Sequence, residues 1–395
     1  MAPFLAASEL DLAGAEVGRF FKMWVSVSRF ALLIALLLAC GVATGCGDTG
    51  SRAFAINDRS VSAADDARLS AGKSPFRFFS PTSFWNRPIP ARARLDRRSA
   101  AIVGAFDEGI AKEEQANKGP ANIVTTAWSV PIYTVPADQP TVMVTLEDAS
   151  PSPALQAAWD VVPLPADAQP AAGTDKHLVV WQPSTNRLWE FWRLEQGPTG
   201  WHAAWGGAVQ NVSTNPGVYG RKAWPGASPY WGASASSLSI VGGLITLEDL
   251  QLGQINHALV IGIPDVRAGV YASPAQRTDG TSTNPLSLPE GAHLRLDRNL
   301  DLAALHLPRL TLMIAEAAQR YGIFVRDGAA NVTFYAQDPV PTGTEPYAGS
   351  NGYFEGKSPG QLLASFPWSH LQLLKMKLHR ISFAPHLASK GMQNP

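Results

Sequence analysis

Apolar side chains alternate on both sides of one turn in a short stretch near the middle of the chain, and this pattern limits the folds that the chain can adopt. Residues 178–194 read LVVWQPSTNRLWEFWRL, and the Pro-Ser-Thr-Asn segment at 183–186 has the composition of a hairpin turn. A four-residue turn pairs Trp181 with Leu188. One side of the hairpin is then wholly apolar, and it carries Leu178, Val180, Trp189 and Phe191. This pattern predicts a hydrophobic core against that side.

The opposite side of the hairpin is chemically different, because a carboxylate and an imidazole lie there among indole rings. In the same register Glu190 lies opposite Val179, and the shared face also carries His177, Trp181 and Trp192, with Trp201 and Trp205 joining from the next segment. Indoles stack on sugar rings, and a carboxylate can act as acid or nucleophile at a glycosidic carbon. In the alternative, both faces are buried and Glu190 pairs with Arg187, Arg193 or Arg277. A register slip of one residue would also exchange the two faces.

Short segments with strand-like patterns recur along the chain between turn signals. They are 126–135, 141–146, 176–182, 187–194, 201–205, 257–264, 293–297, 323–327 and 331–337. Helical spacing occurs at 98–116, 308–322 and 360–377, and Thr246 begins a short capped turn. We therefore expect a mainly β protein with a few helices, built as one domain of the β-sandwich or jelly-roll type.

The first 46 residues have the pattern of a bacterial export leader. The apolar run at 30–46 is short for a membrane span, and small residues precede Cys46. This pattern predicts cleavage before Cys46 and attachment of a lipid there, with Met23 as the true start. We expect a leader at 1–46, a flexible tether at 47–74, the domain at 75–380 and a loose tail at 381–395. The protein would then be exported and lipid-anchored to the bacterial cell envelope; the alternative is a single membrane anchor.

Cysteine and charge content exclude several classes of function. Cys40 and Cys46 are the only cysteines, so a chain cleaved at the leader has no disulfide, no zinc-thiolate site and no cysteine nucleophile. Lys and Arg number 32, as do Asp and Glu, and this balance argues against nucleic acid as a partner. Neither a nucleotide-binding loop nor a GxSxG motif occurs, so no nucleotide cofactor is expected.

Other polar residues offer weaker candidates for a site. Asp175 and His177 point the same way on an extended chain, and together with His257 they could hold a divalent metal. The spacing is not a recognised metal motif, so we expect no cofactor. Arg277 and Asp279 lie in a polar loop, where binding groups are common. Asp327 precedes a glycine, which predicts a hairpin turn first and a catalytic acid second.

Five short motifs resemble those of a group of secreted bacterial proteins to which no activity is attached. They are Trp85-Asn86, Asp175-Lys176-His177, Glu190-Phe191-Trp192, Ile255-Asn256-His257-Ala258-Leu259, and Tyr321-Gly322 followed by Asp327. The resemblance would cover 79–375, which implies one domain. Members of that group often read Pro-Ala-Arg-His where this chain has Pro-Ala-Gln-Arg at 274–277. The missing imidazole weakens a metal site that would need a histidine there.

These features predict a protein that acts on polysaccharide. Glu190 would be the acid or nucleophile, with His177 and His257 in proton transfer and Arg277 holding a polar sugar group. Trp181, Trp192, Trp205 and Asp279 would form the subsites. Both a glycoside hydrolase and a uronate lyase fit this set. The alternative from another class is a glycan-binding or envelope-structural lipoprotein without catalysis.

Overall fold

The computed structural model describes residues 76–115, 121–147 and 152–381. All of these belong to one compact unit. The predicted leader with Cys46, the tether at 47–74 and the tail beyond Ile381 lie outside the described residues, so they stay predictions. None of the helices in the described ranges has the length and hydrophobicity that a membrane crossing needs.

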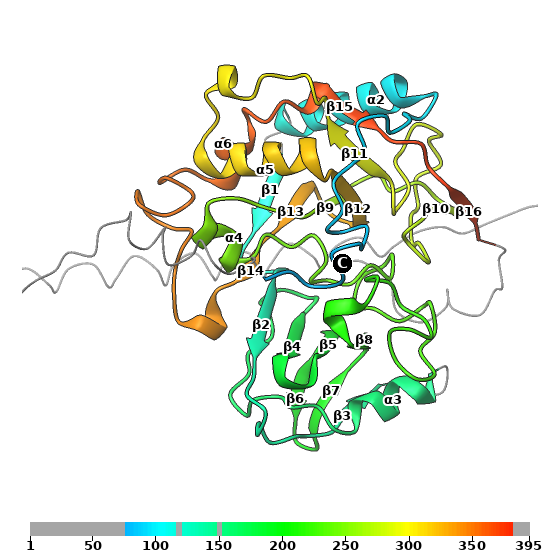
Figure 1. Ribbon diagram of the computed structural model, residues 1–395, viewed down its shortest axis with the longest axis vertical. Coiled ribbons are helices and arrows are strands. Elements are labelled where there is room, and N and C mark those ends of the chain that lie inside the picture. The colour runs from blue at the N-terminus through cyan, green and yellow to red at the C-terminus, as the bar shows by residue number, and fades with distance from the viewer. Residues whose placement is uncertain (1–75, 116–120, 148–151, 382–395) are drawn as a thin grey trace, which may run out of the picture. The chain divides into compact units, whose positions relative to one another are not determined.

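Within these ranges the strands form four sheets (Figure 1). The six-stranded sheet has the order β1 (Ala121–Val124), β13 (Val332–Tyr335), β9 (Leu259–Ile263), β12 (Ile323–Gly328), β11 (His293–Leu296) and β15 (Leu371–Leu373). The five-stranded sheet has the order β14 (Gln337–Asp338), β2 (Val130–Thr134), β4 (Leu178–Gln182), β5 (Arg187–Trp192) and β8 (Trp205–Gln210). A three-stranded sheet contains β3 (Val144–Leu146), β7 (Gly200–Ala203) and β6 (Glu195–Gly197), and a two-stranded one pairs β10 (Val270–Ala272) with β16 (Leu378–Arg380).

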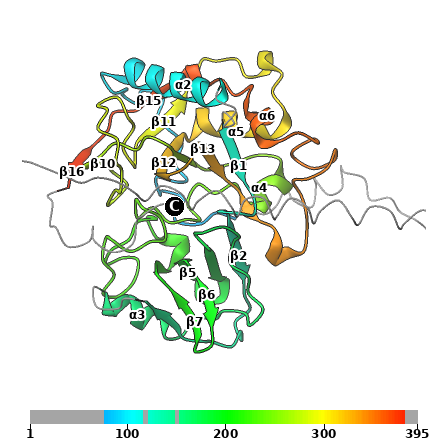
Figure 2. The same cartoon turned by 180° about the vertical axis from the view of Figure 1, so that it is seen from behind.

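The helices lie around the sheets (Figure 2). The α-helices are α2 (Ser99–Gln115), α3 (Pro153–Trp159), α4 (Leu247–Leu252), α5 (Arg309–Arg320) and α6 (Pro359–Leu363). Single 3₁₀ turns lie at Pro183–Thr185, Val212–Thr214, Ala303–Leu305, Val340–Thr342 and Trp368–His370. Helix α5 buries the predicted apolar stripe, since Leu310, Met313 and Ile314 are all covered. The expectation of a mainly β fold with few helices is confirmed.

The finer expectation of a β-sandwich or jelly roll is not confirmed. A jelly roll is built from antiparallel strands, whereas here the sheets are mixed. The pairs β1·β13, β9·β12, β14·β2, β2·β4 and β3·β7 are parallel. Strands β1 and β13 form a parallel pair in the six-stranded sheet, and the chain continues from them to β2 and β14, which form a parallel pair in the five-stranded sheet. These two connections link the two sheets. Two apolar cores lie against these sheets. One is built on the six-stranded sheet, and the other includes residues of both sheets, such as Val180 of β4 and Val260 of β9.

The central hairpin has the register that the sequence predicts. Trp181 lies opposite Leu188, and Glu190 lies opposite Val179. Asn186 closes the turn in the left-handed conformation, with φ of 54°. Asparagine tolerates this conformation better than most residues do. On the predicted core side the four apolar side chains are at most 2% exposed. Local alternation therefore predicted both the pairing and the core-facing side correctly.

Three local predictions are wrong, each for a physical reason. The strand expected at 201–205 is two strands in different sheets, because the chain breaks at Ala204. The helix expected at 360–377 ends at Leu363, and Pro367 cannot continue it. Asp327 is not in a hairpin turn, because β9 lies between β12 and β13. It follows a β-bulge within β12, a feature often found beside functional sites.

Candidate functional site

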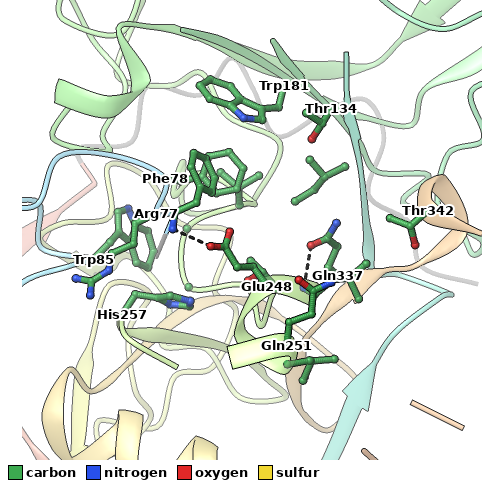
Figure 3. Close-up of a pocket in the computed structure, with 18 of the residues that line it drawn as sticks. Arg77, Phe78, Trp85, Thr134, Trp181, Glu248, Gln251, His257, Gln337 and Thr342 are labelled. Atoms are coloured by element: carbon green, nitrogen blue, oxygen red, sulfur yellow. Dashed lines mark hydrogen bonds between the residues drawn. The ribbon is translucent and has the colours of Figure 1, made fainter. Parts of the chain in front are cut away.

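A pocket of about 500 Å³ lies beside strands β2 and β4 and helix α4 (Figure 3). One wall is aromatic. Trp181 of β4 packs against Phe76 and Phe78, with ring centroids 5.8 and 5.7 Å apart. Phe76 is 47% exposed, so this wall has an open edge at the surface. The volume falls within the usual range for small-ligand pockets.

The facing wall of the pocket is polar and comes mainly from α4. Thr246 and Asp249 form a capping box at the start of this helix, which fixes its first turn. Glu248 and Gln251 therefore project into the pocket, as Figure 3 shows. The Glu248 carboxylate accepts a hydrogen bond from the backbone N–H of Phe76 at 2.8 Å. Polar side chains that also line the pocket are Arg77, Asn86, Thr134, Gln337, Thr342 and Thr344.

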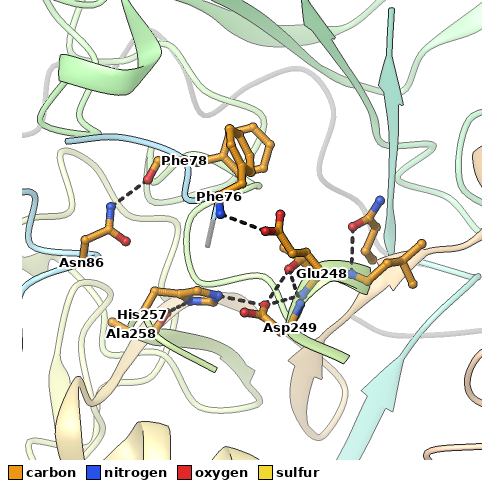
Figure 4. A network of polar contacts seen from close by, with 10 residues as sticks. Phe76, Phe78, Asn86, Glu248, Asp249, His257 and Ala258 are labelled. Atoms are coloured by element: carbon orange, nitrogen blue, oxygen red, sulfur yellow. Dashed lines mark hydrogen bonds and ion pairs between the residues drawn. The ribbon is translucent and has the colours of Figure 1, made fainter. Parts of the chain in front are cut away.

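His257 lines the same pocket, and its imidazole is held on both sides (Figure 4). Its Nε2 lies 3.0 Å from Asp249 Oδ2, and its Nδ1 lies 2.9 Å from the carbonyl oxygen of Ala258. Both partners are acceptors, because Asp249 Oδ2 also receives hydrogen bonds from Thr246. Both ring nitrogens must then donate. Burial lowers the pKa of His257, but attraction to Asp249 and the two hydrogen bonds outweigh it, so the pKa is raised.

Glu190 is not in this pocket, and the expectation of an accessible carboxylate there is wrong. The side chain is 0% exposed. Its Oε1 accepts from the N–H of Ala233 at 2.8 Å, and its Oε2 accepts from Ser239 Oγ at 2.6 Å and from the N–H of Ile240 at 3.0 Å. Burial raises the pKa of Glu190, and these hydrogen bonds lower it in part. The segment 233–240 covers the second face of the hairpin, so this carboxylate anchors that segment.

The predicted indole platform is also divided. Trp181 lies opposite Leu188 near one end of β5, whereas Trp192 and Trp205 face each other at its other end. Leu188 and Trp192 are four residues apart, which is about 13 Å along a strand. Trp205 donates its indole N–H to the carbonyl of Tyr230. Of the three indoles, Trp181 alone lines the pocket.

A second group of predicted residues gathers around the covering segment instead. His177 is buried, with Nε2 3.2 Å from the carbonyl of Ala233, and burial lowers its pKa to about 4. Arg277 donates to the carbonyls of Gly232 and Ser234 at 3.0 and 2.7 Å. Asp175 accepts from the indole N–H of Trp192 at 3.3 Å. His177 and Arg277 therefore both contact the segment 232–234, which gives them structural partners.

The metal set predicted from Asp175, His177 and His257 does not assemble. His257 is bound to Asp249, whereas His177 lies against Ala233. Across the described ranges, the single group of three acidic, histidine or cysteine side chains with ligand geometry is Asp279, Glu290 and Asp327. Asp279 was expected to contact sugar, but it belongs to this group and does not line the pocket.

Comparison of the chain with protein-family models, curated proteins and solved structures finds no match in any of the three. The resemblance drawn from the five motifs therefore stays a hypothesis. What the site can do must follow from its own residues.

Sequence reasoning missed most of the pocket. Phe76, Glu248 and Gln251 line it, yet none was singled out as a binding residue. The aromatic run at 76–79 and the Thr246 cap were both visible signals. Neither shows that the two segments meet, since the contact between Phe76 and Glu248 spans 172 residues.

Proposed function

We propose that this protein binds polysaccharide in the pocket beside Trp181 and does not cleave it. The observation that carries the proposal is the pairing of an aromatic wall with a polar one. Phe76 is 47% exposed and offers a flat apolar surface of the kind on which sugar rings stack, and Trp181, which is 7% exposed, supports it from behind. Gln251 lies on the facing wall and is exposed, so its amide is available to sugar hydroxyls. An apolar wall that faces polar side chains is a usual composition of a binding pocket.

The acid content of the pocket argues against hydrolysis. Glycosidases that act by the usual mechanisms need two carboxyl groups on opposite sides of the scissile bond. Glu248 is the one acidic residue among the described residues that line the pocket. It already accepts a hydrogen bond from the Phe76 backbone. With Glu190 buried elsewhere, the second carboxyl has no candidate.

The histidine of the same pocket is not suited to be the base of a β-elimination. A lyase needs an unprotonated group that can take a proton from the sugar. His257 is the imidazole in the pocket, and both of its nitrogens donate to Asp249 and Ala258. An imidazolium held in this way has no free lone pair. Its positive charge lies against the Asp249 carboxylate, so the pair holds this wall of the pocket in place.

The test is calorimetric titration of the full chain with cellohexaose, chitohexaose and a hexagalacturonate. Gln251→Ala should weaken the binding of the accepted sugar about fivefold, for the loss of one hydrogen bond. Trp181→Ala should weaken it about thirtyfold or more, because the indole supports the rings of Phe76 and Phe78 that form the aromatic wall. Trp128→Ala is the matched control, because Trp128 is 47% exposed and does not line the pocket. It should leave the affinity unchanged.

Two results would contradict the proposal. One is the absence of binding to all three sugars at millimolar concentration. The other is the release of new reducing ends or of unsaturated products in the same mixtures, which would show cleavage. Because Gln251 is exposed, its variant should fold normally, so the outcome does not depend on the bulky substitution at Trp181.

Export and lipid attachment at Cys46 belong to the same proposal and rest on the sequence pattern alone. A lipid anchor would hold the pocket at the cell envelope, where polysaccharides are found. Mass spectrometry of the protein from a bacterial host should find the chain beginning at an acylated Cys46. A chain that retains its first 45 residues would contradict this part of the proposal.

A further inference from the structure

Three acidic side chains from distant parts of the chain meet outside the pocket. Asp279 lies in the loop after β10, Glu290 lies before β11, and Asp327 lies in β12. One carboxylate oxygen from each residue lies within 4.8 Å of the other two. Asp279 is exposed, Asp327 is half-buried and Glu290 is fully buried. The cluster is therefore open on one side and has Glu290 at its base.

The backbone holds two of these carboxylates in place through the glycines that follow them. Gly280 comes after Asp279, and Gly291 comes after Glu290. A Cβ at either glycine would overlap a backbone carbonyl oxygen of a neighbouring segment. Gly291 also has φ of +78°, which other residues rarely adopt. Both turns thus depend on glycine, and the close approach of the segments sets the position of the acids.

Glu290 is the observation that points to a ligand. Its side chain is 0% exposed, and neither oxygen accepts a hydrogen bond of good geometry, although the Thr278 hydroxyl lies close enough to lower its pKa. Buried carboxylates in proteins are normally paired or bound to a metal. Among the described residues, no Lys, Arg or His nitrogen lies within 4.0 Å of any of the three carboxylates.

Two arginines, Arg277 and Arg326, attract these acids, but neither pairs with them within 4.0 Å. Arg326 donates a hydrogen bond to the carbonyl of Ile240. Arg277 is close enough to attract all three acids, but its Nη2 donates to the carbonyls of Gly232 and Ser234. Its guanidinium therefore helps to hold the segment 232–234 and balances only part of the negative charge. The three carboxylates therefore carry negative charge that no cation among the described residues pairs with, and a small divalent ion would compensate it.

We propose that Asp279, Glu290 and Asp327 bind one calcium ion. All three donors are carboxylate oxygens, which suit a hard cation and give zinc or copper no nitrogen or sulfur ligand. Calcium accepts irregular sets of six to eight oxygens, whereas magnesium demands a near-octahedral set. The open side at Asp279 would admit water ligands. Such an ion would tie together the loop after β10, the turn before β11 and strand β12.

The experiment uses the full chain, freed of metal with a chelator, with no sugar present. Calorimetric titration with CaCl₂, up to about 5 mM to include weak extracellular-type sites, should give one ion per chain. Calcium should also raise the melting temperature. Asp279→Asn should weaken calcium binding at least tenfold, and because Asp279 is exposed, this variant should fold. Asp138→Asn is the matched control, since Asp138 is an exposed aspartate outside the cluster.

The results separate calcium from its competitors. Equal affinity in Asp279→Asn and wild type would overturn the proposal, as would a lack of both heat and thermal shift with CaCl₂. Tighter binding of MgCl₂ than of CaCl₂ would overturn the choice of calcium. If Glu290 stays protonated, neither CaCl₂ nor MgCl₂ will bind near neutral pH, and this result would also overturn the proposal of a calcium site. None of these outcomes depends on whether the pocket beside Trp181 binds glycan.

Discussion

Replacement of Glu190 by alanine should destabilise the fold strongly, because three buried donors lose their acceptor. They are the N–H groups of Ala233 and Ile240 and the hydroxyl of Ser239. A buried donor left without a partner costs about 1–3 kcal/mol. The hydroxyl can rotate to another acceptor, and removal of a buried charge recovers part of the loss. We therefore expect the free energy of unfolding to fall by about 3–5 kcal/mol.

Urea unfolding followed by circular dichroism measures this change directly. For a domain of about 300 residues the loss corresponds to a fall in melting temperature of roughly 5–8 °C. Glu190→Gln is the matched variant. Its amide oxygen can still accept two of the hydrogen bonds, while its NH₂ group faces the third donor. The free energy of unfolding should therefore fall less than in Glu190→Ala. Wild-type stability in Glu190→Ala would refute the reasoning. So would a Glu190→Gln protein that is fully stable but no longer binds glycan.

Three further predictions concern pH and packing. Burial lowers the pKa of His293 to about 4, so its contribution of about 3 kcal/mol is complete above pH 6.5 and is lost as pH falls toward 4; His293→Gln should flatten the profile of unfolding free energy in that window. The raised pKa of His257 means that its contribution is present below about pH 6.5 and is lost as pH rises through the raised value; Asp249→Asn should lower the pKa measured by NMR. Gly206→Ala places a Cβ against the backbone of β5 and should cost about 3 kcal/mol or more, whereas Gly104→Ala, in open space on α2, should stabilise by about 0.5–1 kcal/mol in the same urea assay.

Local patterns predicted those parts of the fold that local physics controls. The pairing of Trp181 with Leu188 follows from alternation and a four-residue turn, and it is correct. The cap at Thr246 follows from the match between its side chain and Asp249. The prediction of a helix across 360–377 was wrong because it gave the apolar stripe more weight than Pro367. A proline at that position cannot continue a helix.

The site depended on contacts that no local pattern contains. The segment 233–240 decides whether Glu190 faces solvent. The hydrogen bond from the N–H of Ala233 to Glu190 joins residues that are 43 positions apart in the sequence. Alternation correctly put Glu190 on the side of the hairpin opposite Trp189 and Phe191, but alternation does not show what covers that side. Trp181 was singled out, yet its facing wall comes from α4. The glycan-binding role of the pocket stays a prediction.

The most direct test of the account is a crystal structure of the protein with the hexasaccharide that it binds most tightly. We predict intact sugar density in the pocket, with a ring against Trp181 or Phe76 and a hydroxyl within hydrogen-bond distance of Gln251. Sugar bound beside Trp192 and Trp205 with the pocket vacant, or a cleaved product in the pocket, would contradict the account.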